Sequence, residues 1–145
     1  MHPEVLGSAL ASIGFSVVCG GRQGIMEAVC RGVASGNGIS IGLLPEADAR
    51  HANVHVTIPI ATGIGEARNA LVARAGFCLV AIGDSYGTLS EVALGLQFGR
   101  MVIGLCGAAQ VAGVRHLGNA EAAVDAVASA ALGLTAYDPN ETLTT

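Results

Sequence analysis

The sequence predicts a single α/β domain built on a doubly wound parallel sheet. Strand-like apolar runs alternate with helix-like patterns, and two glycine-rich turns occupy corresponding places, each after a strand and before a helix. The chain has 145 residues, of which 52% are hydrophobic, so it is long enough to bury the core of one domain. Ligands of such folds bind beyond the carboxyl ends of the strands, and we therefore expect a site between the two turns.

The first half of the chain is predicted to contain two helices and three strands. Gly14 ends the first helix, glycines at 36 and 38 end the second, and Pro45 ends the strand that follows. In chain order the predicted elements are helix 5–13, strand 15–19, helix 25–34, strand 39–44 and a short alternating strand at 54–58.

The second half is predicted to contain three helices and two strands. Gly76 and Gly99 stop the first two helices, and an alanine-rich amphipathic pattern marks the third. In chain order these are helix 66–75, strand 77–82, helix 88–98, strand 101–105 and helix 120–132. We assign residues 1–134 to the domain and residues 135–145 to a flexible tail.

Composition limits the partners of this chain. Charged residues make up only 12%, which favours subunit faces buried in a homodimer or homotetramer. A net charge of −4 argues against nucleic-acid binding, which needs basic patches. The apolar runs are short and interrupted, so no membrane span is expected, and the start lacks the basic flank of a signal peptide.

The cysteines and histidines indicate no metal site. The four cysteines have no close spacing, and we interpret them as free thiols, mostly buried, in a reducing cytoplasm. Among the histidines only His51 and His55 lie near each other, in an extended stretch, which is a poor basis for a metal site.

The first glycine turn contains Gly20, Gly21 and Gly24. Backbone N–H groups at a helix start, without side chains in the way, make an anion site. Many turns between a strand and a helix need glycine for geometry alone, so a purely structural role stays open. The pattern is neither a Walker loop nor a Gly-x-Gly-x-x-Gly fingerprint.

The second turn runs from Gly83 to Glu91 and has two interpretations. Thr88 and Glu91 form a Thr-x-x-Glu capping box ahead of an apolar helical run, which would explain both residues without chemistry. The same loop is placed to bind a phosphate or to carry a catalytic carboxylate.

Arg68 lies on a helical segment that is otherwise mostly apolar. One alternative is a solvated helix face. The other is a bidentate contact to a phosphate or carboxylate, for which arginine is the best suited side chain.

Four stretches of the chain, in their order and spacing, together carry a family resemblance. They are Gly20-Gly21-Arg22-Gln23-Gly24-Ile25-Met26-Glu27, Ile41-Gly42-Leu43-Leu44-Pro45, Thr62-Gly63-Ile64-Gly65-Glu66-Ala67-Arg68-Asn69 and Tyr86-Gly87-Thr88-Leu89-Ser90-Glu91. They resemble the Rossmann-like family once labelled "lysine decarboxylase-like", which includes the LOG phosphoribohydrolases that activate cytokinins and the molybdenum cofactor carrier proteins. The resemblance runs from about Leu6 to Leu105.

The resemblance implies roles for particular residues. Catalytic members release a base from a nucleoside 5′-monophosphate, and by that resemblance Glu91 would stabilise the ribosyl centre or orient water, while Arg68 would hold the substrate. The residues expected to bind the ligand are Gly20, Gly21, Gly24, Met26, Thr62, Asn69, Gly83, Ser85, Gly87 and Thr88. The chain contains no lysine, so a pyridoxal phosphate Schiff base, and with it the decarboxylase label, has no chemical support.

This chain departs from the catalytic pattern in its second turn. Gly83-Asp84-Ser85 stands where catalytic relatives have Pro-Gly-Gly, which puts a carboxylate where a phosphate would sit. At about 4 Å and an effective dielectric near 20, two unit charges repel by roughly 4 kcal/mol. We therefore expect Arg22 to face Asp84 across the cleft.

Two further departures bear on function. Arg68 is followed by Asn69, a pattern closer to the carrier proteins than to the Glu-Arg-Lys of catalytic members. The family also begins with a strand and a glycine-containing loop ahead of the first helix. The chain as given lacks both, so we expect an exposed sheet edge or a gap in the site.

The sequence therefore favours a binding protein for a phosphorylated nucleotide- or pterin-like ligand, such as a molybdopterin-type cofactor. A nucleoside 5′-monophosphate phosphoribohydrolase using Arg68 and Glu91 is the first alternative. A degenerate relative whose oligomer is structural is the second.

Overall fold

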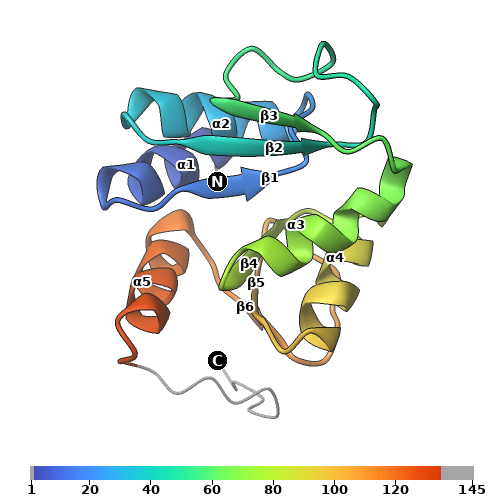
Figure 1. Ribbon diagram of the computed structural model, residues 1–145. Helices are drawn as coiled ribbons and strands as arrows, with labels where there is room; N and C mark the ends of the chain where they lie inside the picture. Colours follow the sequence, from blue (N-terminus) through green and yellow to red (C-terminus); the bar gives the residue numbers. More distant parts are fainter. Residues whose placement is uncertain (1, 135–145) are drawn as a thin grey trace.

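The computed structural model describes residues 2–134 of the chain and confirms the predicted α/β Rossmann-like fold (Figure 1). Its helices are α1 Pro3–Ser12, α2 Ile25–Ser35, α3 Asn69–Ala75, α4 Tyr86–Gln97 and α5 Ala120–Ala131, with a 3₁₀ helix, η1, at Gly65–Arg68. Its strands are β1 Val17–Cys19, β2 Ser40–Leu44, β3 Ile58–Ala61, β4 Cys78–Ile82, β5 Met101–Leu105 and β6 Val114–His116. The predicted tail, residues 135–145, lies outside the described residues.

The strands form two parallel half-sheets rather than one continuous sheet. One half-sheet has the order β1-β2-β3, and the other has the order β4-β5-β6. β1 and β4 are the edges that face each other, because residues of both line one cavity. The cavity therefore lies between these two strands.

The helices cover the half-sheets in packed pairs. α1 packs along α2, and both helices rely on glycine for the close approach: a side chain on Gly7 would meet the Val29 carbonyl, and one on Gly32 would meet the Glu4 carbonyl. α1 also contacts α5, and α3 packs against α4. The largest buried cluster joins α1 and α5 to β5, with Leu6, Ile103 and Ala123 among its members.

Most predicted elements are present within a few residues of their expected bounds, but the strand expected at 54–58 is wrong. Val54 is 86% exposed, and β3 begins only at Ile58, opposite Ile41. The preceding residues turn instead, because the amide of His55 donates to Asn53 Oδ1 at 3.0 Å. β6 was not predicted, since a strand of three residues is too short to show an alternating pattern.

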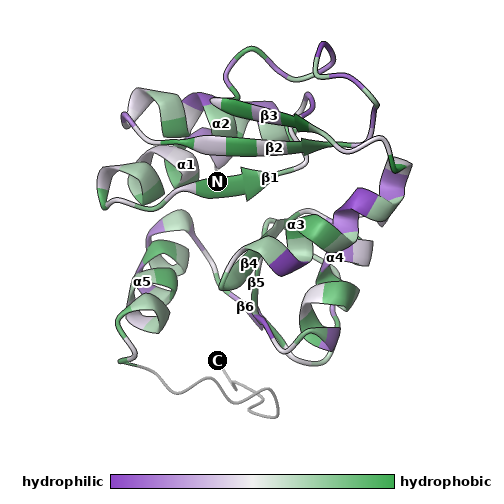
Figure 2. Cartoon of the chain, in the orientation of Figure 1, coloured by the Kyte–Doolittle hydropathy of each residue, from purple (hydrophilic) through white to green (hydrophobic). Residues whose placement is uncertain are grey.

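Hydropathy follows the architecture. The strands are largely hydrophobic, whereas the η1–α3 segment carries hydrophilic residues next to the gap between the half-sheets (Figure 2). Within residues 2–134, no helix has the length and apolar character needed to cross a membrane.

Candidate functional site

A cavity of about 650 Å³ lies between the half-sheets and extends to the two glycine turns. It brings together most of the residues predicted from sequence to form the site. Those that line it are Gly20, Met26, Arg68, Asn69, Gly83, Ser85, Gly87, Thr88 and Glu91. Gly21, Gly24 and Thr62 do not line it, and the structure shows a supporting position for each of them.

The first turn is held by contacts from a distant loop. Gly21 has φ +78°, and a side chain there would lie 2.9 Å from Gly42 Cα, so only glycine fits. Asn53, which is 5% exposed, donates from Nδ2 to the carbonyls of Gly21 (3.3 Å) and Arg22 (2.8 Å). Its backbone amide also donates to the Gly21 carbonyl at 2.9 Å. Asn53 therefore fixes the turn although it lies outside every motif.

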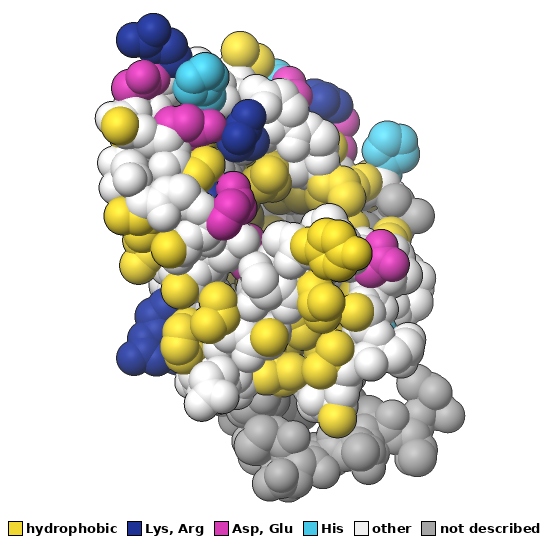
Figure 3. Space-filling model, turned by 90° about the vertical axis from the view of Figure 1, so that its right-hand side faces the viewer, with side chains coloured by type: hydrophobic (Ala, Val, Ile, Leu, Met, Phe, Trp, Pro, Cys, Tyr) yellow, Lys and Arg dark blue, Asp and Glu magenta, His cyan; other side chains and the backbone are white. Residues whose placement is uncertain are grey.

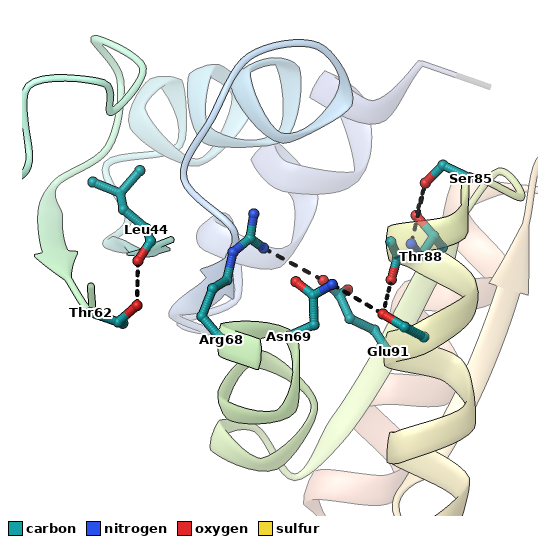
Figure 4. A network of polar contacts seen from close by, with 9 residues as sticks. Leu44, Thr62, Arg68, Asn69, Ser85, Thr88 and Glu91 are labelled. Carbon is teal, nitrogen blue, oxygen red and sulfur yellow. Dashed lines mark hydrogen bonds and ion pairs between the residues drawn. The ribbon is translucent and has the colours of Figure 1, made fainter. Parts of the chain in front are cut away.

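Gly24 and Thr62 stabilise the local backbone and do not line the cavity. Gly24 is the N-cap of α2 and has φ +77°, a conformation that other residues rarely adopt. The Thr62 hydroxyl donates to the Leu44 carbonyl at 2.6 Å, which fastens the chain after β3 to the end of β2 (Figure 4).

Arg68 is buried against the first turn. It ends η1 and is 4% exposed, so the interpretation as a solvated helix face is wrong. A side chain on Gly20 would collide with the Arg68 guanidinium and lie 2.6 Å from Met26 Sδ, so the bare glycine makes room for the arginine. Within the described residues Arg68 Nε has no hydrogen-bond partner. A buried guanidinium with an unused N–H is a ready contact for an anion.

Glu91 faces Arg68 from α4 (Figure 4). Its Oε1 lies 3.8 Å from Arg68 Nη1, too far for a direct hydrogen bond. Burial raises the pKa of Glu91 from 4.5 to about 7, with the Arg68 guanidinium opposing the rise and the Glu66 carboxylate adding to it. Glu91 is therefore close to half-protonated at neutral pH and can exchange a proton there.

Asn69 and Ser90 link η1–α3 to the start of α4. Asn69 Nδ2 donates to Ser90 Oγ at 3.0 Å, and that hydroxyl donates to the Gly87 carbonyl at 2.7 Å. Asn69 Oδ1 is buried and has no hydrogen-bond partner within residues 2–134. Sequence reasoning assigned no role to Ser90, because a serine inside a helical run carries no motif.

The second turn is capped differently from the prediction. Ser85, not Thr88, is the N-cap of α4, and its Oγ accepts the Thr88 amide at 3.2 Å. The capping box of Thr88 and Glu91 is therefore wrong, and Glu91 is free to point at Arg68. The amides of Tyr86 and Gly87 are first-turn donors without a partner inside the helix.

The expected pairing of Arg22 with Asp84 is also wrong. Arg22 Nη1 lies 3.1 Å from Glu46 Oε1, in the loop after β2. Asp84 lines the cavity and makes no ion pair within the described part of the chain. The exposed Asp84 side chain therefore lies at the cavity without an ion-pair partner among residues 2–134.

Two cysteines lie together at the first turn, although their spacing in the sequence gave no indication of this. Cys19 Sγ and Cys30 Sγ are 3.5 Å apart, and Cys19 lines the cavity. The hydrogen bond to Cys30, followed by burial, raises the pKa of Cys19 far above its usual range, so this thiol stays protonated. Among residues 2–134 no cluster of three or more His, Cys, Asp or Glu side chains is placed to hold a metal ion.

Comparison with known proteins agrees with this geometry. The molybdenum cofactor binding protein of Rippkaea orientalis matches with a TM-score of 0.81 and 30% identity over 90% of this chain and 86% of its own. The molybdenum cofactor carrier protein of Chlamydomonas reinhardtii matches with a TM-score of 0.81 and 32% identity over 90% of this chain and 87% of its own.

A sequence relative and a family model point the same way. An uncharacterized protein of Archaeoglobus fulgidus is 33% identical over 120 residues, which are 83% of this chain and 79% of that protein. The model of the SLOG cluster4 family matches residues 2–132. The chain therefore belongs to the SLOG cluster4 family and lies close to the molybdenum cofactor carrier branch.

Proposed function

We propose that this protein binds a phosphorylated pterin- or nucleotide-type ligand, such as the molybdenum cofactor, in the cavity at the two glycine turns. The observation that carries the proposal is Arg68, whose buried guanidinium lies against Gly20 with an unused N–H. The ligand class rests on the solved structures that this chain resembles, which are named for binding or carrying the molybdenum cofactor.

The polar groups of the cavity suit such a ligand. Arg68 and the first-turn amides of Tyr86 and Gly87 would hold the phosphate, since a helix N-terminus favours an anion. Asn69 Oδ1 offers a hydrogen-bond acceptor for an amino group of a heterocycle. Three acidic residues line the cavity, Glu66, Asp84 and Glu91, and their carboxylates oppose a phosphate and lower the affinity expected for the site.

A hydrolase is the second candidate, favoured by Glu91. A carboxyl group with a pKa of about 7, opposite an arginine in a cavity, is suited to general acid–base chemistry at neutral pH. The corresponding reaction would be hydrolysis of the N-glycosidic bond of a nucleoside 5′-monophosphate, with release of the base and ribose 5-phosphate.

Native mass spectrometry of the purified chain, followed by titration with AMP and with molybdopterin, tests the binding proposal. We expect a small-molecule adduct, or saturable binding that Arg68→Ala weakens at least tenfold, about 1.4 kcal/mol. Arg74→Ala is the matched control, because Arg74 lies over the Phe98 ring on the far end of α3 and does not line the cavity. Absence of an adduct and of binding to both probes would favour a structural relative.

A ribose 5-phosphate assay on AMP separates the two candidates. The binding proposal expects no release above the background of a blank reaction. Turnover that disappears in Glu91→Gln, with binding of AMP intact, would overturn it in favour of the hydrolase.

We also propose that the protein assembles into a homodimer or homotetramer. All four residues of β3 are exposed, including Ile58 and Ile60, and Tyr86 is 92% exposed. Figure 3 shows hydrophobic side chains gathered over one part of a face, whereas charged side chains gather towards its upper end. Light scattering coupled to size-exclusion chromatography tests this, and a monomer at micromolar concentration would contradict it.

A further inference from the structure

The thiols of Cys19 and Cys30 form a pair at the first glycine turn, and the proposed binding site makes no use of them. Their Sγ atoms lie 3.5 Å apart and share a hydrogen bond. Cys19 ends β1 and Cys30 lies on α2, so the pair joins the two elements on either side of the turn. The chain between the two cysteines contains the turn at Gly20–Gly24 in full.

The separation of the two sulfurs suits a disulfide. An S–S bond is about 2.05 Å long, so each sulfur has to move by less than about 1 Å to form one. The structure holds all four cysteines as free thiols. The remaining two belong to the other half-sheet, since Cys78 begins β4 and Cys106 follows β5. Cys19 and Cys30 are therefore the pair that is placed to cross-link.

The two thiols differ in access and in acidity. Cys19 is partly exposed and lines the cavity, whereas Cys30 is 0% exposed. The hydrogen bond from Cys19 lowers the pKa of Cys30 below its usual range, against the opposing effect of burial. The same hydrogen bond, together with burial, raises the pKa of Cys19. The proton of the pair therefore resides on the accessible Cys19, and Cys30 is the base that can take it.

We propose that Cys19 and Cys30 are a redox-active pair that hydrogen peroxide, a solute small enough to enter the cavity, converts into a disulfide. Cys19 attacks one peroxide oxygen as its proton passes to Cys30, which breaks the O–O bond, leaves Cys19 as a sulfenic acid and releases hydroxide. The hydroxide takes the proton from Cys30 and becomes water. The Cys30 sulfur then attacks the Cys19 sulfur, which forms the S–S bond, breaks the S–O bond and releases a second hydroxide. The two sulfurs lose two electrons in total, and the peroxide gains them.

The disulfide acts on the binding site through Gly20, which directly follows Cys19. A side chain on Gly20 would collide with the Arg68 guanidinium and lie 2.6 Å from Met26 Sδ, so the three residues are closely packed. Met26 lies on α2, the helix that carries Cys30. Drawing the two sulfurs together therefore shifts Gly20 and Met26 relative to Arg68, and we expect the guanidinium to leave its place. This consequence for binding rests on the proposed function, whereas the disulfide itself does not.

Tryptic mapping of the full chain after treatment with hydrogen peroxide tests the disulfide. The chain has no lysine, and its arginines place the four cysteines in four different tryptic peptides. We expect a disulfide-linked pair of peptides, 1–22 and 23–31, to replace the two free peptides, and dithiothreitol to restore them. Two free thiols after treatment, or a sulfenic acid on Cys19 without the link, would overturn the proposal.

Two variants sharpen the peptide map. Cys106→Ser is the matched control, because Cys106 is exposed and lies outside the pair, and it should form the same link as the wild type. Cys30→Ser should stop the reaction at the sulfenic acid of Cys19, which dimedone traps. If Cys30→Ser does not fold, the wild-type map decides the question by itself.

Two readouts separate the effect on the site from the proposed function. The NMR signal of the Arg68 Nε–H reports on the guanidinium without any ligand, and we expect it to shift on oxidation. Its return with dithiothreitol excludes oxidation of Met26, which this reductant does not reverse. In titrations with AMP and molybdopterin we expect at least tenfold weaker binding to the oxidised chain.

The outcomes of these two readouts are distinct. An unmoved Arg68 signal, or equal affinity of the reduced and oxidised chains, would overturn the effect of the disulfide on the site. A reduced chain that binds neither probe would overturn the proposed function, and the peptide map and the Arg68 signal would then decide the inference without it.

Discussion

The two glycine turns occupy the same place in their βα units but are built in different ways. The turn at Gly20–Gly24 is held from a distance: Asn53 binds its carbonyls, and Gly42 of the neighbouring strand leaves room for Gly21. At the turn Gly83–Tyr86, the Ser85 cap is local, and a backbone bond from the Gly83 amide to the Leu105 carbonyl (3.2 Å) ties the turn to the end of β5. The first turn thus positions a side chain, Arg68, whereas the second exposes backbone amides at a helix start.

Similar glycine patterns therefore have different structural roles in the two turns of one site. The bare backbone of Gly20 is needed because the guanidinium of Arg68 occupies the space beside it. At the second turn, Gly83 has φ +77°, and the nearest atom to an added side chain is 3.9 Å away. There the glycine is needed for its backbone conformation rather than for space.

Gly20→Ala is expected to have the largest effect. The added methyl group meets the ends of the Arg68 and Met26 side chains, which can move aside, so we expect a loss of only about 1 kcal/mol in the free energy of unfolding. Because the Arg68 guanidinium must leave its place, we expect at least a 100-fold loss of ligand affinity. Chemical denaturation and titration with molybdopterin measure the two effects. Gly118→Ala is the control, because nothing lies within 4 Å of an added methyl group there and its φ is not positive. Equal behaviour of the two variants would show that Arg68 does not depend on Gly20.

The second prediction concerns Glu91 on α4, whose carboxylate faces Arg68 beside the first turn. The folded-state pKa of Glu91 is raised from 4.5 to about 7, so the folded protein binds more protons than the unfolded chain between these values. Stability therefore falls as the pH rises from about 4.5 to 7, by up to about 3 kcal/mol. We expect Glu91→Gln to remove this part of the pH dependence.

Denaturation at pH 5 and pH 8 gives the free energy of unfolding that each protein loses between the two pH values. The contribution of Glu91 is the loss in the wild type minus the loss in Glu91→Gln. Glu121→Gln is the matched control, since Glu121 is exposed in the first turn of α5. If Glu91→Gln loses as much stability between the two pH values as the wild type, Glu91 is ionised in the folded protein well below pH 7.

The fold was predictable because it depends on local patterns, and much of the site was predictable because glycine turns at strand ends must meet. What escaped prediction depends on contacts between distant segments. The loop at 45–57 brings Glu46 to Arg22 and Asn53 to Gly21, and no local pattern in that loop indicates either contact.

The N-cap of the second turn was predicted wrongly for another reason. Both Ser85-x-x-Thr88 and Thr88-x-x-Glu91 offer a hydroxyl to an amide three residues on, and the sequence does not distinguish them. Glu91 adopts the second arrangement only if α4 starts at Thr88. Because Ser85 caps the helix three residues earlier, the carboxylate of Glu91 lies one turn inside α4 and faces Arg68.

Asn53→Ala tests the distant support of the first turn and is expected to cost about 2 kcal/mol. The substitution removes two side-chain hydrogen bonds to the turn and the one that Oδ1 accepts from His55. The Arg22 carbonyl loses its Asn53 donor, whereas the Gly21 carbonyl keeps the Asn53 backbone amide. Denaturant unfolding measures the loss. Asn119→Ala, which removes a single exposed cap bond on α5, is the comparison and should cost about 1 kcal/mol. An Asn53 variant no worse than the Asn119 variant would mean that the turn holds its shape without the loop.

Ser85→Ala is expected to have the smallest effect, because the cap is exposed and the Gly83 amide keeps its bond to the Leu105 carbonyl. The Ser85 hydroxyl accepts the Thr88 amide and donates to the Thr88 hydroxyl at 2.9 Å, both at an exposed helix start. Its loss should cost about 1 kcal/mol, as for Asn119→Ala, while affinity for a phosphorylated probe changes by less than threefold, since the amides of Tyr86 and Gly87 stay in place. A stability loss as large as that of Asn53→Ala would mean that Ser85 stabilises more than the start of α4. The two turns would then not differ in how strongly they depend on distant contacts.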